Sequence, residues 1–210
     1  MKKQRGSDFI AVIGTNNTGK SVIVKELIKK FNLKRDRLEA VDRYPANYNK
    51  LIVYDPQDRF KDLLRKGDHV IKLNHDNWAE DVLRYKASLL VMDDYKELFE
   101  NDRLPKQVMN LMSARAEAGI DIILVTWHPK LILPRLSMFI NKFVLLKSNG
   151  KDKDYISRID GEEDFVLSLR DSLNKEYQKY TPEQYAALYP NFPFIYYDSS
   201  TNKAKKINFK

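Results

Sequence analysis

Apolar residues gather along the chain in five short runs that are separated by longer stretches of mixed character. None of these runs alternates apolar with polar residues, as a strand with one solvated face would. Continuous apolar runs of this length are typical of parallel strands that are buried on both faces. We therefore predict central parallel strands at residues 9–13, 51–54, 89–92, 122–125 and 143–146.

Apolar residues with helical spacing fill the intervals between the runs. The pattern predicts helices over residues 20–31, 77–85 and 105–118. The last of these has Pro105 in its first turn and stops at Gly119, a residue type that commonly caps a helix. Alternating strands and helices favour right-handed crossovers, so the pattern predicts an α/β fold, with a mostly parallel sheet covered by helices on both faces.

The pattern changes after Lys147, where turn residues and shorter helical segments replace the long apolar runs. Thr181 and Gln184 match the capping box that opens a helix. In chain order we expect a turn at 148–154 between two strands, helices near 162–177 and 182–188, and a hairpin that pairs 194–197 with 206–209.

Residues 32–49 are polar and irregular, and we expect only a short strand there, at 38–41. No repeat and no linker divides the chain. We therefore expect a single domain over residues 1–210, with a core at about 8–147 and a small C-terminal α+β extension at 148–210.

Composition narrows the class of protein. Lys and Arg total 37 against 29 Asp and Glu, which gives a formal charge of +8 and a pI near 9.4. Such a surplus suits a polyanionic partner such as nucleic acid, although lysines spread for solubility give the same charge. The absence of cysteine excludes disulfides and cysteine zinc sites, and the three histidines are too scattered for a metal cage. No apolar run approaches the ~20 residues that span a bilayer, and the charged start is no signal peptide, so we expect a soluble, intracellular protein.

A phosphate-binding loop, or P-loop, follows the first predicted strand and opens the first predicted helix. Its glycines let the backbone fold around a polyphosphate, and its amide groups point at the anion from the positive end of the helix. In this motif Lys20 reaches the β- and γ-phosphates, and the hydroxyl of Ser21 completes the shell of a Mg²⁺ ion. The alternative is an ordinary turn between strand and helix. The predicted nucleotide-binding residues are Gly14, Thr15, Asn16, Asn17, Thr18, Gly19, Lys20 and Ser21.

Two acids end the third predicted strand. Because this edge of a parallel sheet also carries the P-loop, the carboxylates of Asp93 and Asp94 are predicted to lie beside it. Asp93 would hold Mg²⁺ through its water shell, and Asp94 would orient the attacking water. A strand that simply ends in polar residues is the alternative.

The next predicted strand ends in Thr126, which would lie near the γ-phosphate and sense hydrolysis, with His128 as the second choice. Thr126 could instead cap the following turn. Trp127, between them, is expected to pack rather than to act.

Arg115 lies on or beside the apolar stripe of its helix, so it should have a specific partner. It could be an arginine finger that completes a neighbouring subunit's ATP site, or it could pair with an acid such as Glu117 or extend outward. Arg103 and Arg135 are equally open candidates for the finger.

Together these segments resemble the FtsK–HerA superfamily of DNA-pumping ATPases, and most closely its small viral genome-packaging members. The similarity covers about residues 8–147. Asp94 stands where most relatives carry glutamate, and Trp127 stands where cellular members usually have a sensor glutamine. Besides the P-loop, the matching segments are residues 51–56 with their Asp-Pro turn, 90–94 and 114–126.

The resemblance implies a P-loop NTPase fold of the RecA/ASCE type, with ATP and Mg²⁺ as cofactors and with hydrolysis coupled to DNA translocation. It implies a homo-oligomeric ring, a pentamer or hexamer, that binds ATP between neighbours and pumps double-stranded DNA. A capsid vertex or membrane protein of a virion would be a further partner. The expected location is the host cytoplasm and the virion, and the chain itself is not expected to span a membrane.

Three other classes compete with this interpretation. A small-molecule or nucleotide kinase shares the P-loop, and Arg35, Arg37 and Arg43 could form its phosphate lid, but it would not need the acid pair. A GTPase would need an Asn-Lys-x-Asp turn, and the near match at 141–144 lacks the aspartate. A scaffold that binds ATP without hydrolysis would not need both acids.

Overall fold

The computed structural model describes residues 7–39, 49–71, 77–95, 104–128, 131–147, 163–188 and 192–207. Its helices are α1 (Lys20–Glu39), α2 (Trp78–Leu83), α3 (Lys106–Ala118), α4 (Pro134–Ser137), α6 (Glu163–Tyr177) and α7 (Pro182–Ala187), with a 3-10 turn η1 (Lys61–Leu63). Its strands are β1 (Phe9–Ile13), β2 (Leu51–Tyr54), β3 (His69–Val70), β4 (Leu89–Asp93), β5 (Asp121–Thr126), β6 (Lys142–Leu145), β7 (Phe194–Asp198) and β8 (Lys203–Ile207).

The eight strands belong to one sheet, in the order β3-β2-β4-β5-β1-β6-β7-β8. β2 pairs in parallel with both β3 and β4, and β1 pairs in parallel with β6. Only the C-terminal hairpin breaks the pattern, because β7 runs antiparallel to β6 and β8 runs antiparallel to β7. The predicted mostly parallel α/β sheet with a C-terminal α+β extension is confirmed.

The described residues fall into two compact units, which are treated separately below. One takes its residues from Met1–Phe9 and Ile23–Leu124, and the other from Ile10–Val22 and Val125–Lys210. The expectation of a single domain stays a prediction.

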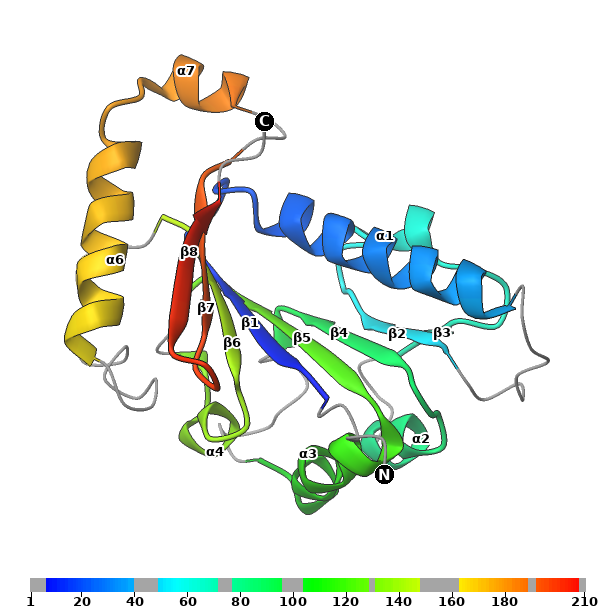
Figure 1. The fold of residues 1–210 in the computed structure, drawn as a ribbon. Helices are drawn as coiled ribbons and strands as arrows, with labels where there is room; N and C mark the ends of the chain where they lie inside the picture. The colour runs from blue at the N-terminus through cyan, green and yellow to red at the C-terminus, as the bar shows by residue number, and fades with distance from the viewer. Residues whose placement is uncertain are drawn as a thin grey trace. The chain divides into compact units, whose positions relative to one another are not determined.

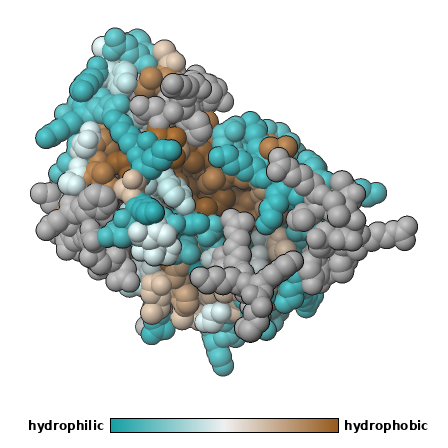
Figure 2. Space-filling model, in the orientation of Figure 1, coloured by the Kyte–Doolittle hydropathy of each residue, from teal (hydrophilic) through white to brown (hydrophobic). Residues whose placement is uncertain are grey.

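The first unit has helices on both faces of its strands. α1 lies over one side of β2, β3 and β4, and α2 and α3 lie on the other side (Figure 1). Every residue of β2 and of β4 is buried, which explains why both read as unbroken apolar runs. The outward side of α1 carries exposed Lys29, Lys30 and Lys34, and hydrophilic residues form most of the surface over this helix in Figure 2.

α3 ends as its sequence predicts. Gly119 follows the last helical residue with a left-handed φ of 69°. The amide of Gly119 donates to the carbonyl of Ala116 (3.2 Å), and the amide of Ile120 donates to that of Arg115 (2.8 Å). These are the two hydrogen bonds of a Schellman motif. Ile120, whose side chain is buried, directly precedes β5.

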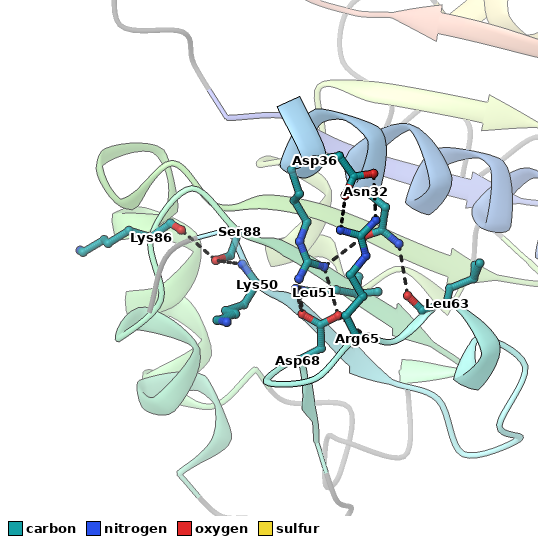
Figure 3. Close-up of polar contacts among 10 residues, drawn as sticks. Asn32, Asp36, Lys50, Leu51, Leu63, Arg65, Asp68, Lys86 and Ser88 are labelled. Carbon is teal, nitrogen blue, oxygen red and sulfur yellow. Dashed lines mark hydrogen bonds and ion pairs between the residues drawn. The ribbon is translucent and has the colours of Figure 1, made fainter. Parts of the chain in front are cut away.

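A buried ion pair joins α1 to the turn before β3 (Figure 3). The side chains of Arg35 and Asp68 are 3% and 1% exposed, and Asp68 accepts both terminal nitrogens of the guanidinium at 3.1 and 2.9 Å. Asp68 also accepts the amides of Leu51 (3.0 Å) and Arg65 (2.8 Å), so four donors surround the carboxylate. Asn32 adds a bond to Arg35 and another to the carbonyl of Leu63. The pair therefore fixes the second half of α1 on the edge of its unit.

The second unit contains the P-loop and the C-terminal hairpin. α6 packs on β7, and the hydroxyl of Tyr177 donates to the carbonyl of Pro193 at 2.6 Å, just before that strand. Lys206 of β8 forms an ion pair with Glu176 of the same helix. At α7 the predicted capping box is confirmed, since Thr181 and Gln184 exchange hydrogen bonds of 2.9 and 3.3 Å.

The sequence prediction of elements is wrong or incomplete at several places. The second strand of the C-terminal hairpin is Lys203–Ile207 and not 206–209, and neither η1 nor α4 was predicted. α1 runs to Glu39, so residues 38 and 39 are helical and not the start of a strand at 38–41, whose other residues lie outside the described part of the chain. β3 was not predicted, because two residues carry no periodicity. The predicted turn at 148–154 also lies outside the described residues.

Candidate nucleotide-binding site

The P-loop occupies the connection between β1 and α1, as predicted. The ammonium group of Lys20 donates to the carbonyls of Gly14 (2.8 Å) and Thr15 (2.9 Å), so the lysine folds back over its own loop. The hydroxyl of Thr18 donates to the Thr15 carbonyl at 2.8 Å. These side-chain hydrogen bonds hold the loop in a compact turn. Lys20 and Ser21 are the first two residues of α1.

An aromatic ring from the C-terminal extension covers the second glycine of this loop. Gly19 has φ +93°, and a Cβ built on it would lie 2.7 Å from Cγ of Phe192. Phe192 is buried and lies next to Pro193, the residue whose carbonyl is held by Tyr177. Glycine is therefore required at position 19 for two reasons, the backbone conformation and the close approach of the ring.

The start of the P-loop is hydrogen-bonded to residues at the ends of two strands. The amide of Gly14 donates to the carbonyl of Thr126 (3.2 Å), at the end of β5, and the amide of Thr15 donates to that of Lys147 (2.9 Å), just after β6. Thr126 is thus directly bonded to the loop. Its hydroxyl exchanges hydrogen bonds with the backbone of His128 at 3.2 and 3.4 Å, which is the turn-capping arrangement considered above. Trp127 is 48% exposed, and its ring lies edge-on to that of His128 with 5.7 Å between the ring centroids.

The acid pair belongs to the first unit. β4 ends at Asp93, whose side chain is 1% exposed, and Asp94 follows with a left-handed φ of 48°. A guanidinium nitrogen of Arg59 lies 2.7 Å from Oδ2 of Asp93 and 3.9 Å from Oδ2 of Asp94. Gln57 donates to Asp94 at 3.4 Å and accepts a hydrogen bond from Arg59. The two acids therefore face the loop that follows β2.

Burial dominates the protonation of Asp93. It raises the pKa of this carboxyl to about 6, the ion pair with Arg59 opposes the rise, and the nearby charges of Asp94 and Asp55 add to it. Oδ1 of Asp93 is buried and accepts no hydrogen bond from the described residues. An unsatisfied carboxylate oxygen at a strand end fits the role of a Mg²⁺ ligand.

Among the described residues no group of three or more His, Asp or Glu could hold a metal ion unaided. A Mg²⁺ ion that works with a P-loop needs no such cage, since substrate phosphates and water supply most of its ligands. A single carboxylate such as that of Asp93 is enough for that arrangement.

Arg115 has the specific partner that the sequence predicted, but it is not Glu117. Its side chain is buried, donates to the carbonyl of Ser7 (2.9 Å) and to the Ser7 hydroxyl, and lies over the ring of Phe9. Burial lowers the pKa of the guanidinium, which the charges of Asp121 and Asp8 counteract. Arg135, on α4, is exposed, and Arg103 lies outside the described residues.

Three residues that contact either the acid pair or the P-loop were not predicted from the sequence. Arg59 and Gln57 follow the Asp-Pro turn after β2, and Phe192 lies before β7. A buried acid needs a cation or donors, which is a signal for Arg59, but many arginines in the chain could have met that need. Nothing in the sequence around Phe192 points to Gly19.

The fold and the P-loop define the class: this is the fold of a P-loop NTPase. Among solved structures, the genome packaging NTPase B204 from Sulfolobus turreted icosahedral virus 2, in complex with ATP-gammaS, matches with a TM-score of 0.65 and 15% identity over 95% of this chain and 96% of that chain. The N-terminal domain of zonular occludens toxin from Neisseria meningitidis matches with a TM-score of 0.51 and 10% identity over 98% and 94%. The cytoplasmic domain of the Type VII secretion ATPase EccC from Thermomonospora curvata matches with a TM-score of 0.52 and 14% identity over 70% and 20%.

At these identities the likeness shows the fold alone, and at that level the predicted resemblance to a viral genome packaging ATPase is confirmed. No family model matches the chain, and no curated protein matches it in sequence. None of the described helices has the length and apolar character needed to cross a membrane.

Proposed function

We propose that this chain is an ATPase that drives DNA translocation and packages a double-stranded DNA genome into a viral capsid. The observation that carries the ATPase class is the P-loop in its strand–loop–helix setting, with Lys20 and Ser21 opening α1. Support for the packaging role comes from the fold, which matches a genome packaging NTPase over nearly the whole of both chains. The charge of +8 suits a polyanionic partner.

In this proposal the P-loop and the acid pair, Asp93 and Asp94, act on one nucleotide. Lys20 binds the β- and γ-phosphates, Ser21 and Asp93 hold Mg²⁺, and Asp94 orients the attacking water. When bound, Mg²⁺ neutralises the charge that develops on the phosphates during transfer. Both groups follow the carboxyl ends of strands in one mostly parallel sheet, which is where such sites form.

We propose the sensor from its hydrogen bond to the P-loop, and the arginine finger from its exposure. Thr126 is hydrogen-bonded to Gly14, and we propose it as the residue that transmits the state of the γ-phosphate. Among the described arginines considered for the finger, Arg135 is exposed whereas Arg115 is committed to Ser7 and Phe9. We therefore propose Arg135 as the finger in a ring of five or six subunits, and a structural role for Arg115.

The kinase alternative loses one of its supports. Arg35, which would belong to the phosphate lid, is instead buried against Asp68.

A viral packaging motor would work in the host cytoplasm and at a capsid vertex, where a capsid or membrane protein of the virion would be its partner.

An ATPase assay with and without duplex DNA, on material separated by size, tests the proposal. We expect the oligomeric fraction to hydrolyse ATP, duplex DNA to stimulate turnover, and the stimulation to fade as salt rises, because contacts with DNA phosphates release counterions. Turnover that ignores DNA while phosphate passes to a small acceptor would establish the kinase instead.

A further inference from the structure

Arg59 is the residue through which the acid pair is held. It contacts both acids, at 2.7 Å to Asp93 and 3.9 Å to Asp94, and its second terminal nitrogen donates to Gln57. We propose that Arg59 competes with the divalent cation for Asp93. Metal binding would then displace the guanidinium from both acids and leave Asp94 able to orient the attacking water. This inference rests on the proposed function of the site.

The competition follows from the small number of carboxylate oxygens. Asp93 has one oxygen in contact with Arg59 and one that is buried without a hydrogen-bond donor among the described residues. A cation that approaches Asp93 must come within a few ångströms of the guanidinium, and two like charges repel strongly at such a distance in a half-buried site. Either the arginine leaves or the metal binds weakly.

The loop after β2 is built so that the side chain can leave while the backbone stays. Phe60, next to Arg59, is fully buried, and its amide donates to Oδ2 of Asp55 at 2.7 Å. The amide of Asp58 donates to the Asp55 carbonyl at 3.2 Å, which closes the turn. The Arg59 side chain itself is 30% exposed, so rotation about its own bonds can carry the guanidinium into solvent.

Departure of Arg59 would also change Asp94. Gln57 is held by the same guanidinium and donates to Asp94 at 3.4 Å, so a single movement loosens both contacts of this acid. Water would then be activated only after the metal has bound. Arg59 is thus a positioning residue that delays hydrolysis until the site is loaded.

Binding of Mn²⁺, measured by water-proton relaxation with saturating non-hydrolysable ATP analogue, tests the competition without any turnover. Removing the competing charge in Arg59→Gln should tighten Mn²⁺ binding roughly tenfold, the size expected for loss of one charged hydrogen bond. Arg59→Lys keeps a charge but not the planar fork, so its affinity should fall between those of the wild type and the Gln variant. Arg84→Gln, which removes an exposed arginine that forms an ion pair with Asp81, is the matched control and should change nothing.

Unchanged or weaker Mn²⁺ binding by a folded Arg59→Gln protein would overturn the inference. If that variant does not fold, the Lys variant decides, and an affinity equal to that of the wild type overturns the inference. Failure of the proposed function looks different: Mn²⁺ binding by the wild type would not depend on the analogue and would survive Lys20→Ala. If the wild type binds no Mn²⁺ at all, both proposals fall.

Discussion

Asp93 has to satisfy two conflicting demands, since the sheet buries it and the proposed chemistry needs it charged. Its pKa is about 6 in the folded protein, because of burial, against an ordinary value of 3.8. Between these values the folded protein binds a proton that the unfolded chain has released. The free energy of unfolding therefore falls as the pH rises through this window.

This contribution should disappear in Asp93→Asn. Relative to the variant, the wild type should lose roughly 2–3 kcal/mol of stability as the pH rises from below the lower pKa to above the upper one. Urea unfolding of both proteins, at several pH values and with a chelator present, measures the difference. Parallel pH profiles would show that Asp93 has an ordinary pKa.

Substitutions of Lys20 and of Asp94 should have different effects on ATP binding and hydrolysis. Lys20→Ala removes the charge that we propose contacts the transferred phosphate, so ATP turnover should be abolished. Asp94→Asn leaves the proposed metal ligands intact, so Mg·ATP should still bind while hydrolysis slows by about 10²- to 10⁴-fold. Lys29→Ala, on the exposed side of α1, is the control and should behave as the wild type. Full turnover by Asp94→Asn would remove this residue from the mechanism.

Single residues of the site differ in how well the sequence predicts them. Lys20 and Ser21 lie in a contiguous motif, whose spacing alone implies its chemistry. The position of Arg59 depends on how the turn at 55–58 directs the next side chain, and Phe192 is far from Gly19 in the sequence although it lies against it in the folded chain. Contacts of this kind arise from tertiary structure and leave no local pattern.

At the scale of elements, the P-loop and the segment before β7 form one packed unit. Gly19→Ala would introduce a strained positive φ and a clash with the Phe192 ring, whereas Gly67→Ala, at φ +87°, would meet only the movable end of Lys50. Strain alone is worth about 1–2 kcal/mol, and overpacking adds about 1–3 kcal/mol. The unfolding free energy should therefore fall further in Gly19→Ala.

A Phe192→Ala background isolates the second contribution. With the ring removed, the two glycine substitutions should cost about the same free energy of unfolding. A difference between them that persists without Phe192 would show that the ring is not what excludes a side chain from position 19.

The buried pair under α1 should be worth far more than a surface pair. Asp68→Ala leaves the guanidinium of Arg35 buried without its carboxylate, and two amides lose their acceptor, so we expect a loss of about 3–5 kcal/mol. Asp62→Ala breaks the exposed pair with Lys25 and should cost about 1 kcal/mol or less. Chemical denaturation of the two variants makes the comparison, and equal losses would contradict a structural role for the buried pair.

The same pair explains the largest error in predicting elements. Residues 32–39 look irregular because they are polar, yet they continue α1, since Asn32 and Arg35 bury their side chains against the β3 turn. A buried polar residue looks like a surface residue in a hydropathy pattern. The apolar strands, by contrast, were predicted within one or two residues, because continuous apolar runs such as that of β4 are typical of strands buried on both faces.

At the scale of the whole molecule, a mostly parallel sheet follows from the alternation of apolar runs and helical segments, and the fold of the packaging NTPase agrees with that pattern. The order of the strands comes from the structure and was not predicted. The functional account adds one claim, that the P-loop and the acid pair of β4 act on the same nucleotide. The sequence predicts this from the rule for parallel sheets, and each half is described above in its own unit.

Anomalous scattering from crystals grown with Mn²⁺ and a non-hydrolysable ATP analogue tests that claim most directly. The account predicts one manganese peak bridged by the β- and γ-phosphates, with the Ser21 hydroxyl and the Asp93 carboxylate in its first or water-mediated shell. A nucleotide bound away from Lys20, or a metal bound without Asp93, would contradict it.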